Sequence, residues 1–221
     1  TGDKGFAGAY NLNVLTTAER HIQELMIDFA KRGINARPKI FIAGRKGKDY
    51  FKNAGFDIVE EFSYPIDSPT FYRARDISDF IHDLYDEEQI DTVYAIYTVM
   101  KSAVNIRPVT LKLIPISAED LMEGVHLEKY RQDIDINSNV NLEFIPASEK
   151  VMDYLATTYL NGMIYGALTE AFASEQTTRM SAMKKATDSV EEIISDYVQE
   201  SNRRRQEKIT GEISEITSFG L

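Results

Sequence analysis

The sequence contains no cysteine, and its last third contains no proline between Ser148 and Phe219. Without cysteine there are no disulfides, thiol nucleophiles or cysteine-ligated metal sites, and a reducing compartment suits such a chain. The longest largely apolar run, Val93 to Met100, is far shorter than the roughly 20 residues of a membrane-spanning helix. We therefore expect no direct insertion into a membrane.

Basic residues are fewer than acidic ones. The chain has 35 acidic and 25 basic residues, a net charge of -10. This balance argues against nucleic-acid partners, whose phosphates require a basic face. Hydrophobic residues make up 43% of the chain, which is enough for a sizeable core and argues against global disorder.

Short apolar runs alternate with amphipathic stretches over the first two-thirds of the chain. Helices are expected at residues 13–32, 44–53 and 72–88, and strands at 39–43, 55–60, 93–100 and 109–116. Residues 1–5 resemble the end of a further strand. This alternation predicts an α/β fold with a parallel-type sheet covered by helices, and we assign residues 1–145 to a Rossmann-like globular domain.

Residues 146–221 are expected to form one long C-terminal helix. Between Ser148 and Phe219, glycine occurs only at positions 162, 166 and 211. A helix of about 70 residues would be about 105 Å long. Its middle carries a heptad pattern of the a and d type, and we call this row the seam: Met180, Met183, Thr187, Val190, Ile194 and Tyr197.

A seam of this kind requires a facing helix. The sequence contains no second helix of comparable length. The facing helix must therefore come from a segment outside this sequence, from another copy of the chain, or from another protein.

Signals for catalysis and cofactors are weak. Gly2, Gly5 and Gly8 have the spacing GxxGxxG, which differs from the dinucleotide fingerprint GxGxxG, and the residues from Gly44 to Asp49 lack P-loop spacing. Each glycine cluster is either a tight turn or a degenerate phosphate loop. The three histidines have no metal-ligand spacing, and there is no GxSxG elbow. We expect no catalytic residue, no cofactor and no metal.

Three segments carry a family likeness. TGDKGFAGAYN at residues 1–11 is similar to the TDRGLCGGLN-like segment of F-type ATP synthase gamma subunits. FASEQTTRMSAMKKATDSVEEII at 172–194 resembles the LASEQAARMVAMKAATDNA stretch of that family, and NRRRQEKITGEISEI at 202–216 is similar to the ending of its members. IAGRKGKDYF at 42–51 also fits the family pattern IGxKGxxFF. The resemblance implies that the long N-terminal helix of the family is lacking before Thr1 of this sequence.

The resemblance implies a non-catalytic rotor subunit. The family fold is an antiparallel coiled coil of the two terminal helices plus a Rossmann-like domain. The coil turns inside a ring of alpha and beta subunits, and the globular foot binds the epsilon subunit and the c-ring. A peripheral location at the cytoplasmic face of a bacterial cell membrane follows from the same resemblance.

The resemblance also implies contact residues. Arg205 and Gln206 match an Arg-Gln pair that contacts a beta-subunit loop, and Phe144 and Pro146 match an aromatic–proline element near the foot. Arg203 and Ile209 adjoin the Arg-Gln pair and belong to the same expected contact. The run from Arg203 to Arg205 is either a solvated helix face or a contact with an acidic protein surface.

Two rival interpretations remain from the sequence. One is a nucleotide-binding enzyme on a Rossmann-like sheet, for which the degenerate glycine loops are the support. The other is a free-standing dimeric coiled-coil scaffold. Self-association through the seam is expected wherever the facing N-terminal helix is absent.

Overall fold

The computed structural model describes residues 1–56, 58–62, 68–102, 105–116 and 147–219. The chain forms two compact units, Thr1–Thr178 and Arg179–Leu221. Phe144 lies outside the described residues, as does Pro146, so the expected foot contact stays a prediction. The expected domain boundary at residue 145 lies there too.

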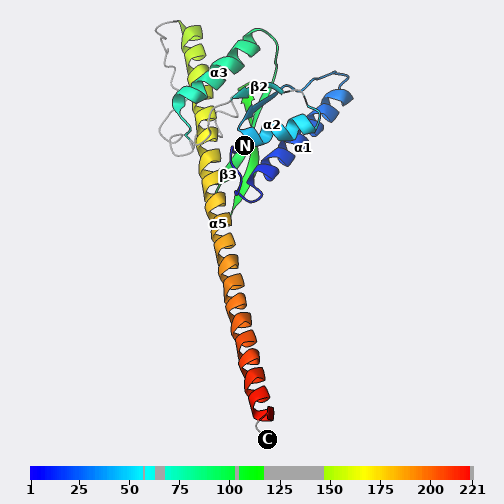
Figure 1. Cartoon of the computed structure of the whole chain (residues 1–221). Helices are drawn as coiled ribbons and strands as arrows, with labels where there is room; N and C mark the ends of the chain where they lie inside the picture. The colour runs from blue at the N-terminus through cyan, green and yellow to red at the C-terminus, as the bar shows by residue number, and fades with distance from the viewer. Residues whose placement is uncertain (57, 63–67, 103–104, 117–146, 220–221) are drawn as a thin grey trace, which may run out of the picture. The chain divides into compact units, whose positions relative to one another are not determined.

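Figure 1 labels most of the helices and strands of the chain. Their bounds agree closely with the sequence expectation and differ most at the first residues of α1, β2 and β4. In chain order they are α1 (Tyr10–Lys31), β1 (Ile40–Ala43), α2 (Arg45–Asn53), β2 (Ile58–Phe62), α3 (Phe71–Asp86), β3 (Val93–Met100), β4 (Ile106–Ile114) and α5 (Ser148–Phe219).

The four strands form two pairs. Strands β1 and β2 are parallel, as expected. Strands β3 and β4 are antiparallel, with Val93 opposite Ile114 and Met100 opposite Ile106. The expectation of parallel pairing is wrong here because the link from Met100 to Ile106 is too short for a parallel crossover. The amide of Lys101 donates to the carbonyl of Asn105 at 3.0 Å.

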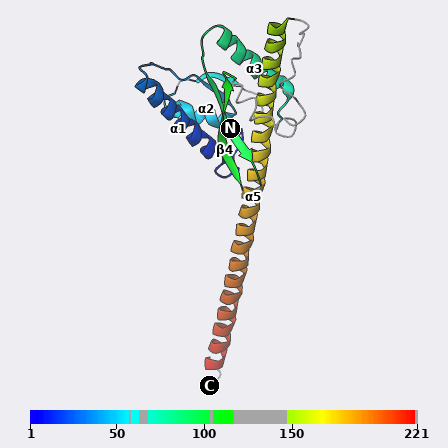
Figure 2. The same cartoon turned by 180° about the vertical axis from the view of Figure 1, so that it is seen from behind.

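The β3–β4 pair has a hydrophobic core on each face. On one face, Val93 and Leu113 pack with buried residues of α3 and of the part of α5 in the first unit, among them Ile81 and Ile164. On the other face, Ile96 packs against a cluster from α1, β1 and α2. Val93 and Ile96 are three apart, and side chains alternate along a strand. Figure 2 shows β4 between α1 and α5.

The second unit is the continuation of α5 from Arg179. Figure 1 shows this stretch of α5 as one unbroken helical ribbon. Nearly all of its described side chains are exposed. Within the described part of the chain, no helix is both long and apolar enough to span a membrane.

Candidate functional site

The seam lies on the exposed part of α5. Met180 is 70% exposed, Ile194 56% and Tyr197 73%; Met183 and Val190 are also exposed. No described residue covers this row. A row of several large, solvent-exposed apolar side chains is unusual on the surface of a monomeric soluble protein and indicates an interaction site.

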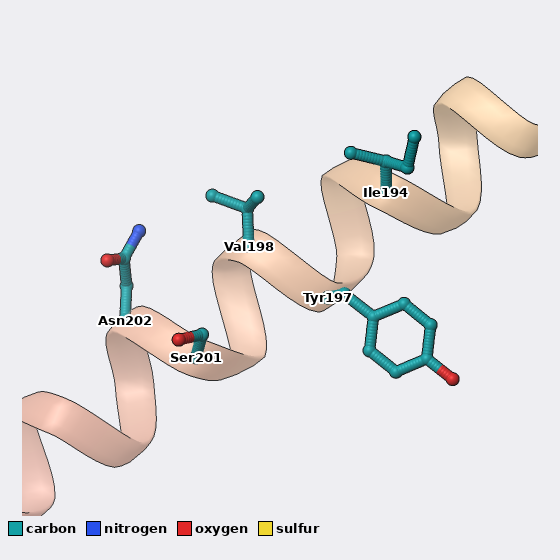
Figure 3. Close-up of a pocket in the computed structure, with 5 residues that line it drawn as sticks. All are labelled: Ile194, Tyr197, Val198, Ser201 and Asn202. Carbon is teal, nitrogen blue, oxygen red and sulfur yellow. The ribbon is translucent and has the colours of Figure 1, made fainter.

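A shallow depression marks the C-terminal end of the seam. It is lined by Ile194, Tyr197, Val198, Ser201 and Asn202. Figure 3 shows all five side chains on one helix, with Ile194 and Val198 pointing to one side and Tyr197 to another. The first four residues stand at i, i+3, i+4 and i+7, which is how one helix forms a hole for the knob side chain of a facing helix. The depression therefore suits a side chain of a facing helix better than a small molecule, which needs a concave site on several elements.

Arginines in the basic run differ in their pairing. Arg203 contacts Glu200 at 3.2 Å and Glu207 at 3.6 Å, and Arg204 contacts Glu200 at 2.8 Å. These exposed pairs lie on one helix and are worth little stability. The Arg205 side chain makes no ion pair or hydrogen bond with any described residue. Of the three arginines, Arg205 keeps its charge available for another protein.

Two further expected contact residues are placed beside Arg205. Gln206 is exposed, and its backbone carbonyl accepts from the hydroxyl of Thr210 at 2.8 Å. Ile209 is exposed one turn beyond Arg205. The structure thus leaves Arg205, Gln206 and Ile209 on an open helix surface, and their contacts with partners stay a prediction.

The glycine loop before α2 is closed by the chain itself. Gly44 has a φ of 98° and offers no capping side chain. The first amides of α2 are instead taken up by the N-terminal segment. Arg45 N donates to Asp3 Oδ1 at 3.0 Å, Lys46 N to the Gly2 carbonyl at 3.2 Å, and Gly47 N to Thr1 Oγ1 at 3.1 Å. A phosphate at this helix start would need those same amides, so the loop is a strand-to-helix turn.

Residues 1–5 do not form a strand. Thr1 Oγ1 donates to the carbonyl of Ala43, the last residue of β1, at 3.1 Å. The next residues, however, turn away from β1, because the Gly2 amide donates to Asn11 Oδ1 at 2.7 Å and its carbonyl serves α2. The Gly2 amide and carbonyl are therefore not available for pairing with β1, whereas the Thr1 amino group donates to the carbonyl of Ala43, at 3.0 Å.

A buried polar junction, not expected from the sequence, lies between this segment and α5. Glu175 on α5 is only 2% exposed. A Cβ added to Gly2 would lie 2.3 Å from Glu175 Oε1. Nearby, Ser174 Oγ donates to the carbonyl of Thr98 at 3.2 Å, and the Tyr10 hydroxyl donates to the carbonyl of Ala171 at 3.0 Å. The available signal was that Gly2 and Glu175 belong to two separate family-like motifs.

Two tyrosines in the first unit have altered acidity. The pKa of Tyr50 is raised because its hydroxyl donates to Glu19 Oε2 at 2.6 Å, with desolvation adding to the effect. Burial raises the pKa of Tyr97, and the charge of Glu170 acts in the same direction. Both shifts keep the phenol neutral, which suits packing between elements.

Clusters of potential metal ligands are absent from the described residues. His82 Nδ1 lies 3.1 Å from Asp86 on the same helix, and the ring of His21 packs edge-on against Tyr94. His126 lies outside the described residues. The described histidines thus have packing or surface partners.

Comparisons with known proteins identify the family. The family model described as ATP synthase matches residues 1–219. The ATP synthase gamma chain of Ruminiclostridium cellulolyticum is 37% identical over 97% of this chain and 68% of the relative. The gamma chain of Staphylococcus aureus is 36% identical over 98% of this chain and 69% of the relative.

Solved structures share the fold. The central stalk and c-ring of Tetrahymena thermophila mitochondrial ATP synthase match with a TM-score of 0.56 and 21% identity, covering 85% of this chain and 73% of the matched chain. The OSCP/F1/c-ring structure of Euglena gracilis mitochondrial ATP synthase matches with a TM-score of 0.59 and 16% identity, covering 99% and 69%. Family model, relatives and fold agree, and the chain belongs to the ATP synthase gamma chain family.

Proposed function

We propose that this chain is the central-stalk rotor subunit that couples ion-driven rotation to ATP synthesis or hydrolysis in a ring of alpha and beta subunits. It is a non-catalytic subunit, so bonds are made and broken elsewhere in the complex. The observation that supports a shaft role is the second unit: a helix in a chain of this family whose apolar seam is open to a partner helix.

A rotor acts through contacts that differ with its angle. The exposed part of α5 offers such differences, because the seam is apolar while Glu200, Arg203 and Glu207 form a charged surface. A catalytic subunit can be driven from one conformation to another only by differential interaction free energy. Reversing a population from 1:99 to 99:1 requires about 5.5 kcal/mol, more than one exposed ion pair supplies. Torque must therefore be spread over many contacts.

Specific partners are part of the proposal. The Arg203, Arg205, Gln206 and Ile209 surface would contact the beta subunit, and the globular unit, with Phe144 and Pro146, would contact the epsilon subunit and the c-ring. In this arrangement the chain is peripheral to the cytoplasmic face of a bacterial cell membrane. The resemblance of the motifs supports these assignments, as do the bacterial relatives.

The proposal also includes the helix that faces the seam. An N-terminal helix of the family type would cover Met183, Val190 and Ile194. Without that helix, a second copy of this chain is the available source of a facing helix. The alternative of an independent dimeric scaffold is disfavoured by the family match over residues 1–219, and a nucleotide-binding enzyme is disfavoured by the occupied amides of α2.

The test is a double substitution in the assembled complex. With Arg205→Ala and Gln206→Ala together, we expect ATP turnover to fall by about tenfold, equal to about 1.4 kcal/mol in the barrier. Arg203→Ala is expected to have a smaller effect because Glu200 and Glu207 already neutralise that charge. Arg32→Ala, which removes an exposed arginine paired with Asp28 on α1, is the control. Wild-type turnover in the double variant would disprove the role of this surface.

A further inference from the structure

The buried face of α5 changes character within the first unit. Leu160, Ile164 and Ala167 are buried apolar side chains, and the first two pack in the cluster shared with α3, β3 and β4. Further along the same helix, the buried side chains are those of Ser174 and Glu175, which are 0% and 2% exposed. Buried polar groups are normally hydrogen-bonded. This part of α5 is therefore held by polar contacts with other elements.

Two hydroxyl groups tie this part of α5 to the rest of the first unit. The Ser174 hydroxyl donates to the carbonyl of Thr98 on β3 at 3.2 Å. The hydroxyl of Tyr10, the first residue of α1, donates to the carbonyl of Ala171 at 3.0 Å. Tyr10 and Thr98 are themselves buried, so both hydrogen bonds are shielded from water. The helix is thus bonded to two different elements within one turn.

Gly2 adds a close contact from a third element. A Cβ added to Gly2 would clash with the carboxylate of Glu175, so the N-terminal segment and α5 approach each other as closely as glycine allows. Together with the two hydrogen bonds, this contact defines the junction. The junction consists of the residues Gly2, Tyr10, Thr98, Ala171, Ser174 and Glu175.

Directional contacts give the junction a role that the apolar cluster does not have. Ala171, Ser174 and Glu175 stand at i, i+3 and i+4, which places them on one face of the helix. Apolar burial is non-directional, whereas a hydrogen bond weakens steeply as its distance and angle change. A rotation of α5 about its axis, or a slide along it, would break the bonds of Ser174 and Tyr10. The junction therefore fixes the rotation and the register of α5 in the first unit.

The junction also lies at the end of α5 within the first unit, which closes at Thr178. The Thr178 hydroxyl donates to the carbonyl of Ser174 at 2.8 Å, and a Cβ added to Gly8 would lie 3.9 Å from the methyl group of Thr178. Side chains from Arg179 onward are mostly exposed. Because α5 is continuous, a load on its exposed part reaches the junction before it reaches the apolar cluster at Leu160.

We infer that the junction is the joint through which torque passes between the exposed part of α5 and the globular unit. Tyr10 and Ser174 are then positioning residues for rotary coupling, because their hydroxyl groups hold the helix in one rotation. The inference rests on the proposed function as a rotor subunit. The apolar cluster is the alternative joint, and in that case coupling would follow the packing of the cluster.

The test compares two double variants of the full-length subunit in the assembled ATP synthase, reconstituted into lipid vesicles. Tyr10→Phe with Ser174→Ala removes both hydroxyl groups and leaves the apolar cluster unchanged. Ile81→Val with Ile164→Val is the control, because it trims two buried side chains of the cluster and leaves the junction unchanged. Both pairs lower the melting temperature of the isolated chain, so a purely structural role would affect both alike.

The readout is the membrane potential built up per ATP hydrolysed, followed with a voltage-sensitive dye. We expect this ratio to fall by at least about twofold in the hydroxyl variant, because each hydrogen bond lost shifts the population of the engaged joint by about twofold or more. The control variant should keep the wild-type ratio. A wild-type ratio in the hydroxyl variant, or an equal fall in both variants, would overturn the inference.

Single substitutions keep the test decisive if the hydroxyl variant fails to assemble. Tyr10→Phe and Ser174→Ala each remove one bond, and each should lower the ratio while the complex still assembles. Wild-type ratios in both single variants would equally overturn the inference. If the complex with the wild-type subunit hydrolyses ATP without building a potential, the rotor function itself fails. The two failures are therefore distinguishable.

Discussion

At the scale of single residues, the polar junction around Glu175 shows how two distant motifs depend on each other. Glu175 is a carboxylate withdrawn from water on α5, and Gly2 provides the space for it. A buried charge is tolerated only with polar partners. The Gly2 backbone in turn bonds Asn11 and Lys46. The N-terminal segment, the start of α2 and the first-unit part of α5 therefore form one connected network.

Gly2→Ala tests this junction. The new methyl group would lie 2.3 Å from Glu175 Oε1, so the carboxylate or the backbone must move. Overpacking of this kind costs about 1–3 kcal/mol, and we expect a loss of unfolding free energy in that range. Urea denaturation followed by tyrosine fluorescence is the measurement. Gly5→Ala is the matched control, because nothing lies within 4 Å of its added Cβ. Equal stability of the two variants would contradict the close approach.

At the scale of elements, sequence patterns predicted where helices and strands lie better than how they pair. The strand expected at 93–100 is β3 at its full length, and the helix expected at 146–221 corresponds to α5 (Ser148–Phe219), because apolar runs and the lack of proline are local signals. The antiparallel β3–β4 pairing was missed, since an apolar run does not encode strand direction. The short link after Met100 was the available clue.

Function-related residues also divide into those with a local sequence signal and those that depend on tertiary structure. The seam was predictable because a heptad is a periodic pattern, and its exposure agrees with the need for a facing helix. The burial of Glu175 does not follow from the helical pattern, since a buried glutamate and a solvated one give the same local pattern; its place in a family-like motif was the available signal.

Protection of the backbone amides of α5 against hydrogen exchange should change sharply along the helix. In the first unit, its residues Leu160, Ile164 and Ser174 are buried against the sheet and α3. From Arg179 onward, most side chains are exposed. Helices without tertiary packing are marginal in water, so we expect amides after residue 179 to exchange much faster in the dilute isolated chain. Hydrogen exchange with mass spectrometry measures this. Uniform slow exchange through residue 219 at low concentration would contradict the expectation.

At the scale of the whole molecule, the globular unit buries its own hydrophobic core, whereas the described residues of the helical unit bury almost none of their side chains. The first unit buries two clusters around the β3–β4 pair and closes its own helix start at α2. The second unit has no comparable burial among its described residues. A subunit built this way gains its remaining stability from partners, since binding to the folded state stabilises it by mass action.

The exposed seam leads to a prediction for the isolated chain. Full burial of a large aliphatic or aromatic side chain is worth about 1.5–3 kcal/mol, and the seam has five of them: Met180, Met183, Val190, Ile194 and Tyr197. Even partial burial of this set can exceed the entropic cost of weak association. We therefore expect concentration-dependent self-association, measured by sedimentation over a wide concentration range.

Two neighbouring isoleucines make this prediction specific. Ile194 belongs to the seam, whereas Ile193 is 52% exposed but lies about 100° away around the helix. Ile194→Ser should weaken self-association by about tenfold, because a burial loss of about 1.4 kcal/mol is a factor of ten in the equilibrium constant. Ile193→Ser removes the same side chain outside the row and should have little effect. If both variants associate like wild type, or if the wild-type chain stays monomeric with the helix after residue 179 fully formed, the row is not an association surface. A separate helix with the complementary apolar row could also be added to the chain. If it restores the monomer, the same surface serves both self-association and pairing with a facing helix.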